Sequence, residues 1–188
     1  MSVITMVDDA KQLNGLSPQL ERELRLIAPE VIPHLDRITE AFYEELMALP
    51  TTSPFLEGRL DQLKKTHRTW LETLLTDDYD GEMAQFLERV GRRHVEVGLP
   101  LELMVGAMTI LQRHLQVLLV ELFGDDPERL KTALLAVTAA LGFSLQLMQQ
   151  TYHLSAMREE LNRFLEITGI SPQLFHNLAK AYEGRVSV

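Results

Sequence analysis

The chain of 188 residues contains no cysteine, and this absence removes several kinds of site at once. Disulfides, iron–sulfur clusters and cysteine–zinc sites are excluded, which fits a reducing cytoplasm. Basic residues are also in deficit, with 18 lysines and arginines against 27 aspartates and glutamates and a formal net charge of −9. Because nucleic-acid backbones are polyanions, this charge disfavours nucleic acid as a partner.

Glycine-rich loops and strictly apolar runs of membrane-spanning length are missing as well. No apolar run reaches membrane-spanning length without charges, and the N-terminus lacks a basic start followed by an apolar stretch. We therefore expect neither a membrane helix nor a signal peptide. Phosphate-binding loops, acidic metal-binding hairpins and flavin or nicotinamide sites are also not found, so the sequence predicts a non-enzymatic protein.

The residues that are present predict an all-α fold. Apolar residues make up 46% of the chain, β-branched residues never alternate as strands require, and glycine and proline fall at segment ends. We expect helices over residues 18–28, 30–49, 60–75, 81–97, 100–123 and 128–165, and a last amphipathic segment around residues 174–182. We divide the chain into an N-terminal extension (1–16), a domain (17–165) and a C-terminal helical tail or linker (166–188).

The most informative stretch runs from Arg89 to Met108. It places His94 near the end of one helix, with a Gly-Leu-Pro turn at residues 98–100 before the next helix begins. Val90 and His94 are four residues apart, so His94 points where the apolar side chains point. A histidine at such a helix end can direct its ring into a pocket. Taken alone, any one of the six histidines is more often a surface residue than a ligand.

The context of His94 resembles the proximal histidine and the following corner of the globin-coupled sensors, the haem-binding sensory branch of the globins. Gly91 lies just before His94, and a Gly106-Ala107 pair lies on the next helix. The resemblance covers about residues 17–160 and implies a sensor globin domain with protohaem IX, in which His94 is the proximal iron ligand. The resemblance further implies that the domain senses a diatomic gas, with O₂ favoured over CO and NO. It also implies an output module outside this chain.

The resemblance also implies a distal side of the haem. The Ala-Phe-Tyr-Glu-Glu-Leu segment around Tyr43 is similar to the helix whose tyrosine donates a hydrogen bond to bound O₂, which carries partial negative charge that CO lacks. Leu63, Thr66 and His67 are expected along the distal wall. His67 has two interpretations: it reaches the iron as a sixth ligand, or it is a core or rim histidine and the ferrous iron is five-coordinate.

The remaining expected pocket residues are apolar side chains that would be ordinary core in any helical protein. They are Phe42, Phe55, Trp70, Leu87, Val90, Val97, Met104 and Met108. The two methionines replace aromatic residues usual in the family, which predicts a looser pocket. Basic residues that could meet the haem propionates are Lys64, Arg68, Arg92 and Arg93.

The expected helices over residues 100–123 and 128–165 are apolar more than halfway round, so each needs a second burial partner. This surplus fits a homodimer in which the helices pair with their copies in a four-helix bundle, as in the resembling family. The alternative is that the N-terminal segment or the tail covers the face within one chain.

Other functions stay open at this point. A non-haem globin-fold signalling or dimerisation domain would carry a bulky or apolar residue at position 94. A single-domain gas-binding globin shares the haem chemistry but not the output. An enzyme that detoxifies nitric oxide would need a reductase.

Overall fold

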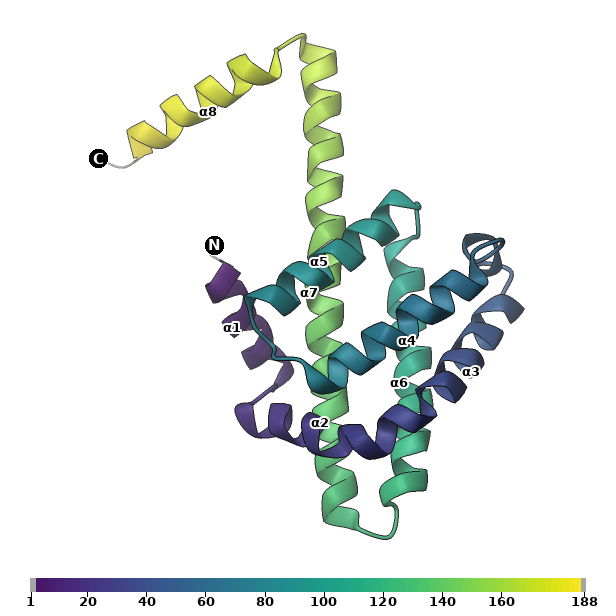
Figure 1. Cartoon of the computed structure of the whole chain (residues 1–188). Helices are drawn as coiled ribbons and strands as arrows, with labels where there is room; N and C mark the ends of the chain where they lie inside the picture. The colour runs from purple at the N-terminus through teal and green to yellow at the C-terminus, as the bar shows by residue number, and fades with distance from the viewer. Residues whose placement is uncertain (1–2, 187–188) are drawn as a thin grey trace. The chain divides into compact units, whose positions relative to one another are not determined.

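The computed structural model describes the backbone of residues 3–186 and the side chains of residues 6–182. The helices are α1 (Val3–Asn14), α2 (Pro18–Val31), α3 (Leu35–Ala48), α4 (Leu60–Thr76), α5 (Gly81–Glu96), α6 (Leu101–Phe123), α7 (Pro127–Thr168) and α8 (Pro172–Val186), with short 3₁₀ turns η1 (Ile32–His34) and η2 (Ser53–Phe55). No strand occurs within this described part (Figure 1). The predicted all-α class is therefore confirmed.

Two boundaries differ from the expected helices. The helix α2 continues through Pro29 to Val31, where we expected a new helix to begin. A proline inside a helix removes one hydrogen bond, but Ile27 and Val31 on the same face are fully buried and hold the helix together past it. Residues 3–14, which we assigned to an extension, form α1 and bury Val7 and Ala10.

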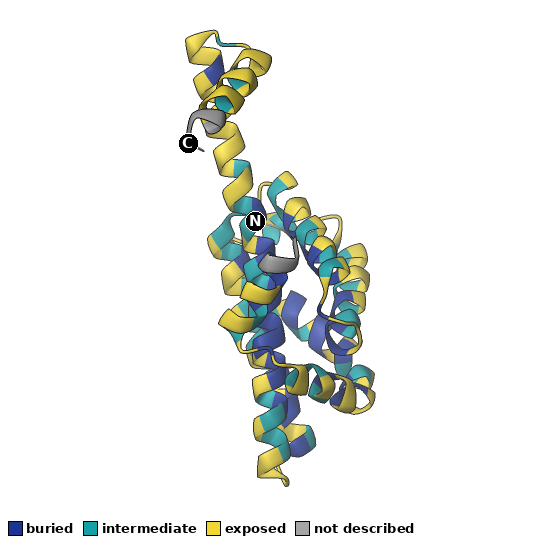
Figure 2. Ribbon diagram, turned by 90° about the vertical axis from the view of Figure 1, so that its left-hand side faces the viewer, coloured by how far each residue is buried: buried dark blue, intermediate teal, exposed yellow. Residues whose placement is uncertain are grey.

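The chain divides into two compact units, residues 1–151 and residues 152–188. In the first unit α3 packs on α4 and α6, α2 packs on α4, and α1 packs on α5 (Figure 1). In the second unit, residues 152–182 are mostly exposed, apart from buried Leu165 (Figure 2). The predicted domain boundary at residue 165 stays a prediction.

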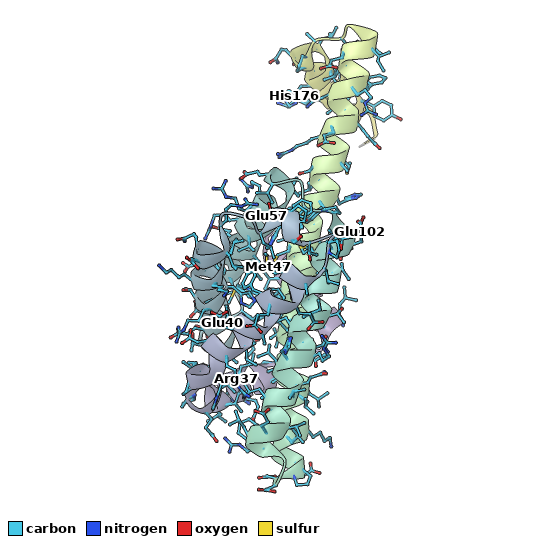
Figure 3. The ribbon with its side chains drawn as sticks, turned by 90° about the vertical axis from the view of Figure 1, so that its right-hand side faces the viewer. Arg37, Glu40, Met47, Glu57, Glu102 and His176 are labelled. Atoms are coloured by element: carbon cyan, nitrogen blue, oxygen red, sulfur yellow. The ribbon has the colours of Figure 1, made fainter. Side chains whose placement is uncertain are left out.

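Ion pairs connect the outer face of α3 to its neighbours. Figure 3 shows Arg37 and Glu40 along this face; Arg37 pairs with Glu121 of α6 at 2.5 Å, and Glu40 pairs with Lys64 of α4. Exposed pairs of this kind contribute little to stability, because water and salt screen them. They place α3 between α4 and α6, while apolar burial supplies most of the stabilisation.

The core of the first unit is built on α6 and the first part of α7. Fully buried side chains on these helices are Leu111, Leu118, Leu119, Ala133, Ala136, Ala140 and Phe143. By length and composition alone, α6 and α7 could each cross a membrane, with 33% and 50% of their most apolar windows buried. The expectation that no apolar run reaches membrane-spanning length without charges is therefore wrong for α7, where residues 132–157 carry no charge. Core helices meet the same criterion, so the absence of a membrane partner stays a prediction.

The helix that carries His94 lies unusually close to α7. At buried Gly91 of α5, a Cβ atom would lie 2.4 Å from Thr151 Oγ1, 2.6 Å from the carbonyl oxygen of Met148 and 2.9 Å from its Cα. Any larger residue would meet α7 backbone there. Gly91 therefore sets how closely α5 approaches α7, one helical turn before His94.

Candidate functional site

A large cavity of about 1290 Å³ lies among α3, α4, α5 and α6, with Met148 of α7 at its wall. This volume exceeds the range of about 300–1,000 Å³ typical of small-molecule pockets. Predicted site residues that line the cavity are Phe42, Tyr43, Phe55, Leu63, Thr66, His67, Trp70, Val90, His94, Val97, Met104 and Met108. Leu87 is fully buried and does not line it, because it belongs to the face of α5 that is buried with Met83, Ala84 and Gly91.

His94 stands in the last turn of α5, where the helix is about to end. Gly98 adopts a positive φ of 70°, which favours glycine, and the Leu99 N–H donates to the His94 carbonyl oxygen at 3.0 Å. Pro100 then leads into α6. The predicted Gly-Leu-Pro corner is thus present, and it fixes the backbone of His94 at the edge of the cavity.

The ring of His94 is half-buried and neutral. Burial lowers the pKa of His94, and the backbone carbonyl of Val90 partly opposes this shift. Nδ1 is enclosed by protein atoms and forms no hydrogen bond of normal geometry among the described residues. A neutral imidazole is the form that binds metals, so His94 has the charge state of an axial ligand.

The distal wall gathers aromatic rings around His67. The His67 ring stacks on Phe42, with ring centroids 4.6 Å apart and 1° between the planes. Tyr43 meets the same ring edge-on at 5.5 Å, and Trp70 lies tilted at 5.6 Å. Burial lowers the pKa of His67 to about 4, so its ring is neutral at physiological pH.

Tyr43 is buried in α3 with 6% of its surface exposed. Its ring packs edge-on against Phe42 at 5.0 Å. Burial raises the pKa of the Tyr43 hydroxyl, so the phenol stays protonated. The hydroxyl can therefore donate a hydrogen bond from the cavity wall; its role toward a bound gas stays a prediction.

Thr66 lines the cavity but is exposed, and its hydroxyl donates to the carbonyls of Gln62 and Leu63 in its own helix at 3.1 and 3.0 Å. The threonine that contacts a distal residue is Thr39, whose Oγ1 lies 3.2 Å from Nδ1 of His67. We did not single out Thr39 from the sequence. The available signal was a polar residue inside an apolar helix face, four positions before Tyr43.

The four predicted propionate partners are all in ion pairs. Lys64 pairs with Glu40, Arg68 with Glu72 and Asp36, Arg92 with Glu88, and Arg93 with Glu96. Lys64 and Arg68 do not line the cavity. Arg59, Lys65 and Arg89 do line it, and no ion pair involves them in the part of the chain that the structure describes.

Two of the buried polar groups in the cavity wall are imidazoles, which fit a haem because a neutral imidazole can ligate its iron, whereas an indole N–H can only donate a hydrogen bond. Three buried nitrogens without a hydrogen-bond partner, His67 Nε2, Trp70 Nε1 and His94 Nδ1, all belong to residues that line the cavity. Among the described residues no cluster of three or more histidine or acidic side chains could hold a bare metal ion. A haem iron needs only one or two protein ligands, which is what this cavity offers.

The helices and the histidine-lined cavity define a globin domain. The chain belongs to the protoglobin family, whose model matches residues 5–158. The globin domain of the Geobacter sulfurreducens globin-coupled sensor is similar, with 26% identity, a TM-score of 0.72, and coverage of 77% of this chain and 96% of that one. The ferric globin domain of E. coli DosC is similar in fold, with 20% identity, a TM-score of 0.65, and coverage of 78% and 99%.

A search of the curated proteins found no match. The family and the structural neighbours confirm the predicted globin fold and the resemblance to globin-coupled sensors. They also support the predicted haem-based gas-sensor function. No output module accompanies the globin domain within residues 3–186.

Proposed function

We propose that this chain is a haem-based gas sensor domain, with O₂ as the gas and His94 as the proximal ligand of the iron. One observation carries the proposal: His94 ends its helix at a glycine corner and lines a cavity of about 1290 Å³ together with Tyr43 and His67. The pKa of His94, which burial lowers, supports it. When bound, the haem iron supplies a coordination position that a diatomic gas can occupy.

The cofactor we propose is protohaem IX, held without covalent bonds. Covalent haem attachment uses cysteines, and the chain has none. Arg59, Lys65 and Arg89 line the cavity without carboxylate partners, so we assign them to the haem propionates in place of Lys64 and Arg68. Phe42, Met104 and Leu111 are buried in the wall and exclude water.

We propose that His67 would hold the haem iron together with His94 in the gas-free state. Its Nε2 is buried without a hydrogen-bond partner, and such an atom costs about 1–3 kcal/mol of stability. Coordination by Nε2 would remove this cost, and the neutral ring is ready for it. If His67 held the iron in this way, gas binding would require its release, and the protonated Tyr43 hydroxyl could donate a hydrogen bond that favours O₂ over CO.

We also propose that the domain forms a homodimer through α6 and α7. On α6, Val117 and Val120 are 55% and 53% exposed, and on α7 Leu135 is 53% exposed. Exposed apolar faces of this kind mark interaction surfaces. We expect Val120→Glu to convert the dimer to a monomer in sedimentation velocity, whereas Arg22→Glu, an exposed position on α2 outside the proposed interface, should stay dimeric. An unchanged dimer with Val120→Glu would contradict this interface.

We further propose how the domain acts in the cell. The domain signals in the cytoplasm to an output module, has no enzymatic activity of its own, and has neither nucleic acid nor a membrane as a partner. The acidic charge of −9 supports the exclusion of nucleic acid.

The test is the variant His94→Ala, with His153→Ala as its control because His153 is exposed and does not line the cavity. We expect His94→Ala to lose the Soret band after haem reconstitution while far-UV circular dichroism shows unchanged helix. The control should retain stoichiometric haem. If folded wild-type protein takes up no haem, the non-haem signalling domain is the better account.

A further inference from the structure

Thr39 makes a polar contact in an otherwise apolar part of the distal wall. It lies on α3, is only 3% exposed, and is flanked on the same face by buried Ile38 and Phe42. Its Oγ1 is 3.2 Å from Nδ1 of His67 on α4. A buried hydroxyl must form a hydrogen bond to offset its desolvation, and the partner found here is the imidazole.

This contact is unusual for a threonine of this protein. Seven other threonines on helices donate to a backbone carbonyl three or four residues earlier in their own helix; Thr69, for example, donates to the Lys65 carbonyl at 3.1 Å. Helical threonines commonly bond in this way. The Thr39 hydroxyl instead crosses from α3 to α4, so the pairing depends on how these two helices pack.

The aromatic neighbours of His67 define the plane of its ring but not the position of its proton. Stacking on Phe42 and the edge contact with Tyr43 restrict rotation of the ring. Neither neighbour distinguishes one ring nitrogen from the other by a hydrogen bond. The contact with Thr39 does, because it engages Nδ1 and leaves Nε2 enclosed without a partner.

A neutral imidazole carries its proton on one nitrogen, and the bond made by that nitrogen decides which atom can ligate a metal. If Nδ1–H donates to Thr39 Oγ1, Nε2 keeps a lone pair. If the hydroxyl donates to Nδ1, Nε2 carries the proton and cannot bind iron. The hydroxyl of threonine can accept a hydrogen bond as well as donate one.

We propose that Thr39 is a positioning residue, which accepts a hydrogen bond from Nδ1–H of His67 and so presents the Nε2 lone pair to the haem iron. The inference rests on the proposed haem-binding function and extends it to the residue that prepares the distal ligand. Thr39 itself does not touch the iron; it acts through His67.

The first test does not need haem. Long-range ¹H–¹⁵N NMR of the full haem-free chain reports which nitrogen of His67 carries the proton, with His67→Ala assigning the signal. We expect the Nδ1–H form in the wild type and in Thr39→Ser, which keeps the hydroxyl. An Nε2–H form in the wild type would overturn the proposal, whether or not any variant folds.

The second test uses the haem-loaded protein. We expect Thr39→Val, which removes the hydroxyl at nearly constant shape, to lower the ratio of six- to five-coordinate ferrous haem by about tenfold, since losing such a partner typically costs 10–100-fold in ligand affinity. Thr39→Ser should restore the ratio. An equal ratio in wild type and Thr39→Val would refute the role of Thr39 while leaving haem binding intact. Failure of the proposed function would instead appear as absent haem uptake in every variant.

Discussion

The close approach of α5 to α7 provides the sharpest mechanical prediction. In Gly91→Ala the new Cβ would lie 2.6 Å from the Met148 carbonyl oxygen and 2.9 Å from the Met148 Cα. The hydroxyl of Thr151, at 2.4 Å, belongs to a side chain and can turn away, but the two Met148 atoms are helix backbone. The helices must therefore separate by several tenths of an ångström.

Overpacking of this kind costs about 1–3 kcal/mol, and rigid backbone neighbours favour the upper end. The better helix propensity of alanine offsets about 1 kcal/mol of this loss of stability. We expect Gly91→Ala to lower the free energy of unfolding by about 2 kcal/mol, measured by urea denaturation of haem-free protein. In a chain of this size the loss corresponds to a fall in melting temperature of about 4–8 °C.

The matched control is Gly106→Ala on α6, where a Cβ would meet nothing within 4 Å. It removes the same backbone freedom without a clash, so we expect it to raise the free energy of unfolding by up to about 1 kcal/mol. Equal stability of the two variants would refute the argument that Gly91 is required by the contact with α7.

Buried polar groups should respond measurably to substitution and to pH. Tyr79→Phe removes the 2.6 Å hydrogen bond from the Tyr79 hydroxyl to the Leu74 carbonyl and should cost about 1–2 kcal/mol in urea denaturation; an unchanged midpoint would contradict it. Tyr43→Phe should speed O₂ dissociation about tenfold in stopped-flow measurements and leave CO dissociation nearly unchanged, since only O₂ gains from the donor. His67 alone should cost the haem-free protein about 3 kcal/mol of stability as the pH falls from about 6.5 to 4, because burial lowers the pKa of His67 to about 4 and the unfolded chain then binds the extra proton. His67→Ala should remove this part of the pH dependence, and the lowered pKa of His94 leaves a further part.

Much of the fold could be predicted because its signals are local. Apolar spacing of three and four residues marks the long helices, and Gly98 with Pro100 marks the corner after His94. The continuation of α2 past Pro29 could not be predicted from local rules, since burial of Ile27 and Val31 by distant helices outweighs the proline.

In the candidate site too, residues marked by local sequence could be predicted, and contacts set by helix packing could not. His94 and Tyr43 were identified from local context in the chain, and both line the cavity. Thr39 was missed because its contact with His67 joins residues 28 positions apart. The predicted propionate partners Lys64 and Arg68 are paired elsewhere, Lys64 with Glu40 and Arg68 with Glu72 and Asp36, and such pairings depend on helix packing and side-chain geometry that composition does not reveal.

The most direct test of haem binding by this globin domain is a haem titration of the purified wild-type chain, followed by absorption in the ferric, ferrous and ferrous–CO states. We predict saturation at equimolar haem, a Soret band, sharp low-spin bands in the gas-free ferrous state from His94 and His67, and conversion on adding CO. A broad high-spin ferrous spectrum would remove His67 from the iron but keep His94. If the folded chain took up haem without saturation, this result would contradict the central claim that the globin domain binds one haem at a specific site.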